Sequence, residues 1–118
     1  MPAPERPPIF TLLCELLDWT LDRTASFPKS HRFTIGQRPD AFTLDALERC
    51  VESIYAAPPA KCAPLTALNL LLEKLRVFWR IVCGRGWISR QQMLFVAAKI
   101  DEIGRMTGGW LASMEKRK

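Results

Sequence analysis

Apolar residues recur at intervals of three and four along four segments of this chain, which is the spacing of helices that bury one face. The first segment begins near Ile9 and ends before Pro28, because a residue that precedes proline is pushed out of the helical conformation. The inward stripes predicted in chain order are Phe10, Leu13, Leu17 and Leu21; Leu44, Leu47, Val51 and Ile54; Leu65, Leu68, Leu72, Leu75, Trp79 and Val82; and Met93, Val96, Ile100, Ile103, Thr107, Trp110 and Met114. No segment alternates apolar and polar residues for long enough to predict a sheet. The pattern predicts an all-α protein, an antiparallel up-down four-helix bundle.

The start of the second helix is ambiguous. Thr34 and Gln37 have the spacing of a capping box, which favours a helix from Thr34. Pro39 would kink the first turns of such a helix, because it removes a backbone donor. Alternatively, Pro39 occupies the first helical position and the regular helix begins there. The kinked early start is the favoured prediction, and the helix should end near Ala57, before two further prolines.

Other boundaries follow from prolines, glycines and caps. Pro64 suits the first turn of the third helix, residues 83–86 (CGRG) interrupt the apolar period, and Ser89 with Gln92 forms a second capping box. We expect a Pro-rich lead-in without regular structure at residues 1–8, the bundle at 9–114 and a basic tail at 115–118.

The last helix contains three glycines within six positions. Gly104 and Gly108 lie four residues apart on one face, close to Trp110. Because each glycine costs about 1 kcal/mol relative to alanine inside a helix, their presence indicates close approach of another helix or another subunit. Gly108 and Gly109 could instead end the helix, but the apolar period continues beyond them.

The charge of the chain is positive and unevenly distributed, which favours acidic partners. The 118 residues carry a net charge of +5. Residues 1–60 hold six basic and eight acidic side chains, whereas residues 61–118 hold eleven and four, a net of +7. Such a balance favours nucleic acid or an acidic protein face as a partner, although a pair of solvated basic helices would give the same count.

Residues for catalysis or metal binding are scarce. His31 is the single histidine, the four cysteines have no ligand spacing, and the glycines do not form a phosphate loop. We therefore expect no enzymatic activity, no metal and no cofactor. The cysteines lie in or beside apolar stretches and predict reduced thiols in a cytoplasmic protein. No signal peptide and no membrane-spanning segment is expected.

Two groups of cations are the candidate binding residues. Arg76 and Arg80 share one face of the third helix, and Lys74, Arg85 and Arg90 would extend them into a phosphate-binding stripe. Alternatively, Arg76 forms an ion pair with Glu73 on a solvated face. The second group lies around the first loop and consists of Lys29, His31, Arg32 and Arg38.

Three runs carry a resemblance to a known family. They are FPKSHRFTIGQR at 27–38, LRVFWRIV at 75–82 and DEIGRMTGGW at 101–110. In this order they resemble the accessory variability determinant (Avd) family of diversity-generating retroelements, over about residues 12–111. Pro39 departs from the family pattern, which expects an ordinary helix former there.

The resemblance implies a ring-like homopentamer of four-helix bundles with a basic surface. It implies association with a reverse transcriptase and template RNA or an RNA/DNA hybrid, in support of error-prone cDNA synthesis, without catalytic residues. Arg76 and Arg80 match the family's third-helix arginines, and Arg105 would pair with Asp101. The alternative is a structural adaptor, similar to a bundle family encoded in intervening sequences of ribosomal RNA genes, which shares the FP-x-x-x-R-F-T-x-G pattern.

Overall fold

The computed structural model describes residues 6–115. Its elements are α1 (Pro8–Thr24), the short 3₁₀ turns η1 (Lys29–His31) and η2 (Ile35–Gln37), α2 (Arg38–Tyr55), η3 (Pro58–Lys61), α3 (Cys62–Gly84) and α4 (Arg90–Glu115). No strand occurs within these residues, so the all-α prediction is confirmed. The predicted lead-in at 1–5 and the tail at 116–118 lie outside the described residues, and Pro8 and Glu115 belong to helices.

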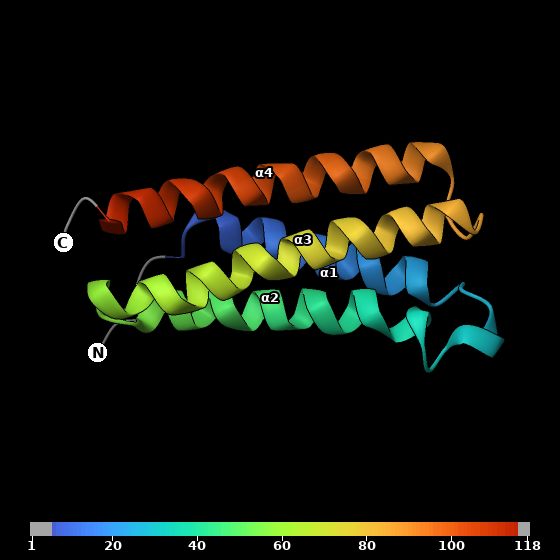
Figure 1. The fold of residues 1–118 in the computed structure, drawn as a ribbon, viewed down its shortest axis with the longest axis horizontal. Helices are drawn as coiled ribbons and strands as arrows, with labels where there is room; N and C mark the ends of the chain where they lie inside the picture. The colour runs from blue at the N-terminus through green and yellow to red at the C-terminus, as the bar shows by residue number, and fades with distance from the viewer. Residues whose placement is uncertain (1–5, 116–118) are drawn as a thin grey trace.

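The four long helices lie side by side along the 47 Å axis of the molecule, an arrangement compatible with a helical bundle (Figure 1). The connections α1–α2 and α3–α4 lie at one end, which we call the loop end and define as residues 25–37 and 85–89. The connection α2–α3 lies at the other end, together with both ends of the described chain. No helix among residues 6–115 is long and apolar enough to span a bilayer.

The core follows the predicted stripe of α3. All six side chains of that stripe, from Leu65 to Val82, are fully buried. Trp79 is the largest of them, and it packs edge-on against Trp19 of α1 and Phe27 of the loop end. Large apolar side chains occupy every position of this stripe at alternating intervals of three and four, which is why the periodicity predicts the buried face.

The predicted stripe of α2 is wrong at two positions. Leu44 and Val51 are 45% and 39% exposed. Beyond Pro39 in the first turn, the buried side chains are instead small, and they are Thr43, Ala46, Cys50 and Ser53. Both hydroxyls donate to carbonyl oxygens one turn earlier in the same helix, at 2.7 and 2.8 Å, so these polar groups are satisfied in the interior. A similar shift occurs in α1, where Leu16 and Thr20 are buried and Leu21 is exposed.

The favoured early start of the second helix is also wrong. Regular α2 begins at Arg38 with Pro39 in its first turn, as the alternative predicted. Thr34 donates its hydroxyl to the carbonyl of His31 at 3.3 Å and forms no cap. In this tight turn a β-carbon at Gly36 would lie 2.8 Å from the same carbonyl oxygen, so glycine is required there.

The start of α4 has the predicted capping box. The Ser89 amide donates to Gln92 Oε1 at 2.8 Å, and the Gln92 amide donates to Ser89 Oγ at 3.1 Å. The preceding turn passes through Gly86, whose φ of 76° favours glycine. α4 then continues through the glycine pair 108–109 to Glu115, so these glycines do not end the helix.

Candidate nucleic-acid interface

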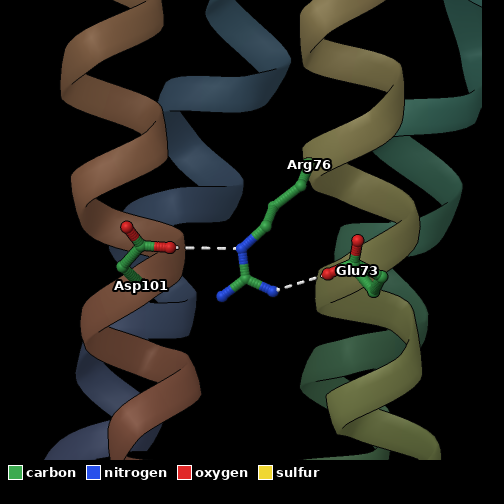
Figure 2. A network of polar contacts seen from close by, with 3 residues as sticks. All are labelled: Glu73, Arg76 and Asp101. Atoms are coloured by element: carbon green, nitrogen blue, oxygen red, sulfur yellow. Dashed lines mark hydrogen bonds and ion pairs between the residues drawn. The ribbon is translucent and has the colours of Figure 1, made fainter.

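Arg76 is engaged in an ion-pair network between α3 and α4 (Figure 2). Its Nε donates to Asp101 Oδ1 and its Nη1 donates to Glu73 Oε2, both at 3.1 Å. The side chain is 27% exposed. Two carboxylates therefore neutralise the charge of this arginine, and its guanidinium holds two helices together rather than facing solvent alone.

Gly104 makes room for this network. A β-carbon at Gly104 would lie 3.0 Å from Arg76 Nη2, so the guanidinium lies directly over the glycine. Arg105 was expected to pair with Asp101, but the pair that forms is with Arg76 of the neighbouring helix. The packing of Arg76 against Gly104 therefore accounts for this glycine by a contact between two helices of the same chain.

Arg80 differs from Arg76 although it lies one turn further along the same helix. It is exposed, and it forms no ion pair within residues 6–115. Its side chain borders a cavity of about 100 Å³ between α3 and α4, beside Trp79 and Met93. Of the two arginines proposed from the third helix, Arg80 is the one whose charge is available to a ligand.

At the loop end, Trp87 joins the two connections. Its ring centroid lies 5.2 Å from those of Phe27 and His31 in the α1–α2 connection. The guanidinium carbon of Arg85 lies 5.1 Å from the same ring, and Arg85 Nη2 lies 3.5 Å from His31 Nε2. Trp87 is half-buried and packs the two connections against each other.

Five exposed cations lie in the two connections of the loop end or directly after them, on segments far apart in the sequence. We call them the loop-end cations, and they are Lys29, Arg32, Arg38, Arg85 and Arg90. None of them forms an ion pair in the described part of the chain. Arg85 and Arg90 of the first predicted group thus lie at the same end of the molecule as the second group, where their charges add.

A groove beside the loop end contains the remaining predicted cation, Lys74. Lys74 and Arg38 line it together with Phe33, Phe42 and Phe78, and its volume is about 640 Å³. Lys74 Nζ lies 5.7 Å from the centroid of the Phe42 ring. Phe33, which is 79% exposed, is not among the binding residues predicted from the sequence. The available signal was an aromatic residue directly after a basic run, KSHR.

A second hollow, of about 400 Å³, lies between the end of α1 and the start of α2. Asp40 lines it and accepts a 2.7 Å hydrogen bond from Thr24 Oγ1. Burial raises the pKa of Asp40 above its ordinary value, and the Thr24 hydrogen bond lowers it by a smaller amount. Arg32 lies at the same hollow but forms no ion pair with this carboxylate.

Comparison with protein families decides the assignment that the three sequence runs suggested. The model of the bAvd-like family matches residues 11–114, which is nearly the whole chain. The chain belongs to the bAvd-like family. It is therefore an Avd-related protein, and the predicted resemblance is confirmed. Searches of curated proteins and of solved structures found no match.

The outer faces of this bAvd-like chain carry many apolar side chains. Those exposed on α2, α3 and α4 are Leu44, Val51, Tyr55, Leu70, Val77, Ile81, Leu94 and Phe95. At Gly108, unlike Gly104, the position of a β-carbon has no described atom within 4 Å apart from the local backbone of its own helix. Trp110 is half-buried, with Lys61 Nζ 5.8 Å from its ring centroid. These residues leave room and apolar area for a second protein surface.

The thiols of the bAvd-like chain are free. Burial raises the pKa of the Cys50 thiol to about 11 and also raises that of Cys14. A raised pKa keeps a thiol protonated near neutral pH, and a protonated thiol is a poor nucleophile and metal ligand. Within residues 6–115 no group of three or more potential metal ligands occurs.

Proposed function

We propose that this bAvd-like protein is a non-catalytic accessory factor of a diversity-generating retroelement. It binds template RNA or an RNA/DNA hybrid, together with reverse transcriptase, and supports mutagenic reverse transcription. The single observation that carries the proposal is that the five loop-end cations lie at one end of the molecule without carboxylate partners in the described residues. Unpaired cations at one end of a molecule bind phosphates and release counterions when they do so.

The proposal places Arg80 in the interface and removes Arg76 from it. Arg80 extends the positive surface along α3, whereas the two carboxylates beside Arg76 already neutralise its charge. Lys74 contributes from the same helix through the groove beside the loop end. Nucleic acid therefore contacts the loop end and one side of α3.

The proposal includes assembly of the up-down bundles into a ring-like homopentamer. Support comes from the exposed apolar residues on three helices and from the open space at Gly108. Apolar surface of this kind is commonly covered by another subunit. A ring also multiplies the number of loop-end cations that one long RNA can contact, which strengthens binding without new kinds of contact.

The test is RNA binding by purified protein at two salt concentrations, with solution mass measured by light scattering. Wild-type protein should be a pentamer and should bind labelled RNA more weakly at higher salt. The double charge reversal Arg85→Glu with Arg90→Glu should weaken RNA binding at least about tenfold, because phosphate contacts are lost. Each lost phosphate contact should also reduce the salt slope by about one.

The matched control reverses two exposed cations elsewhere, Arg6→Glu with Arg105→Glu. It changes net charge equally, and Arg105 lies about 22 Å along α4 from Arg90, by helix rise. Equal losses in both double variants would argue against a loop-end interface. A pentamer that binds neither RNA nor a retroelement reverse transcriptase would favour the alternative, a structural adaptor that oligomerises without a nucleic-acid role.

A further inference from the structure

The Phe33 groove, defined by Phe33, Phe42, Phe78, Arg38 and Lys74, combines aromatic rings with unneutralised cations. Phe42 and Phe78 contact each other edge to face, with centroids 5.3 Å apart. The Phe33 side chain is 79% exposed and contacts no other aromatic ring in the described part of the chain. Its ring is therefore not needed for the core and is free to contact a ligand.

The charges at the groove select the kind of ligand. Both ionisable side chains that line it are cations, and no carboxylate lines it. An apolar protein surface placed here would remove water from Arg38 or Lys74 without supplying an opposite charge, which is unfavourable. A polyanion with flat apolar faces, in contrast, matches both the cations and the rings.

We infer that the Phe33 groove binds single-stranded RNA, with an unpaired base stacked on Phe33 and neighbouring phosphates bound by Arg38 and Lys74. The inference rests on the proposed function and specifies its substrate as single-stranded. Aromatic side chains that stack bases beside cations that bind the backbone are the means by which proteins hold single strands without reading sequence. Bases in a duplex are already stacked and paired, so a duplex cannot use Phe33 in this way.

The experiment compares two RNAs of equal length, one single-stranded and one duplex, by fluorescence anisotropy at two salt concentrations. Phe33→Ala should weaken single-strand binding about tenfold, within the range of base stacking on one aromatic ring. Duplex affinity should change less than twofold, and the salt slope should be unchanged because no phosphate contact is lost. Phe33→Trp should retain single-strand binding. Leu21→Ala, which removes an exposed apolar side chain of α1 outside the Phe33 groove and outside the apolar residues of α2, α3 and α4, is the matched control and should leave both RNA affinities unchanged.

Each outcome separates this inference from the proposed function. Unchanged single-strand affinity of Phe33→Ala, with wild-type binding to both RNAs intact, overturns the inference and leaves the proposed function standing. Equal losses on single strand and duplex, or a fall in oligomer mass, also overturn it, since Phe33 would then serve assembly or a partner protein. Wild-type protein that binds neither RNA overturns both. The melting temperature of Phe33→Ala should equal that of wild type because the ring is exposed.

Discussion

The middle of the α3–α4 contact and the loop end both contain arginines beside a tightly packed group, yet they use charge in opposite ways. At the first, two carboxylates flank Arg76, and the guanidinium lies over Gly104. At the second, Arg85 lies over the Trp87 ring beside His31 and has no carboxylate partner in the described residues. An arginine count along the sequence cannot separate these cases, because the partner on the neighbouring element decides whether the charge remains available.

The largest expected effect breaks the packing at the loop end. Trp87→Ala removes the ring that contacts Phe27 and His31, and should lower the free energy of unfolding by about 2 kcal/mol, less than for a fully buried tryptophan. Trp87→Phe keeps an aromatic contact and should lose less than half of that. Urea denaturation measures both variants. Equal losses in the two variants would contradict an aromatic role for this residue.

A smaller effect tests the network at Arg76. Arg76→Ala should cost about 1 kcal/mol, whereas Arg80→Ala should change stability by less than about 0.5 kcal/mol. Gly104→Ala should stabilise the Arg76→Ala variant by about 1 kcal/mol through helix propensity. In wild type the same change should gain less, since the new β-carbon would displace the guanidinium.

A double-mutant cycle of Arg76→Ala and Gly104→Ala, measured by urea denaturation, gives the coupling between the two positions. Zero coupling would show that the guanidinium does not depend on the glycine. Gly108→Ala is the control, because open space at Gly108 predicts no coupling to Arg76.

The smallest effect concerns Asp40 at the loop end. Burial raises its folded-state pKa above the ordinary 3.8, so the folded chain holds this proton to higher pH than the unfolded chain does. The contribution of Asp40 to the free energy of unfolding therefore falls as pH rises from its unfolded-state pKa through its folded-state pKa, and it stays lower at higher pH. Asp40→Asn, which can still accept from Thr24, should raise stability at pH 7 and give no gain at pH 3. Thermal unfolding at the two pH values measures this, and an equal gain at both would contradict it.

The sequence predicted the fold where core positions are large and apolar. Every stripe residue of α3 met that condition, and each is buried. The prediction of the buried face of α2 was wrong because that face contains small residues such as Thr43 and Ser53. Their hydroxyls donate hydrogen bonds to carbonyl oxygens of the same helix. A hydropathy period assigns such residues to the surface and brings Leu44 and Val51 inward instead.

The cations of the candidate site were predictable from the sequence, but Phe33 and the geometry were not. The spacing along the third helix and the position of the first loop indicated the two groups of cations. Glu73, three residues before Arg76, was the only local partner that spacing could suggest; Asp101 lies on another helix. Two other features likewise depend on how the helices pack. These are the contact of His31 with Trp87 and the common groove lined by Arg38 and Lys74.

The Trp87 contacts also affect the entropy of binding. Connections between helices usually retain conformational freedom that a ligand must remove, and each immobilised side chain lowers affinity. Here the aromatic contacts of Phe27, His31 and Arg85 with Trp87 tie the two connections together before any ligand arrives. If the loop end binds nucleic acid as proposed, we therefore expect electrostatic attraction rather than the ordering of loops to govern association.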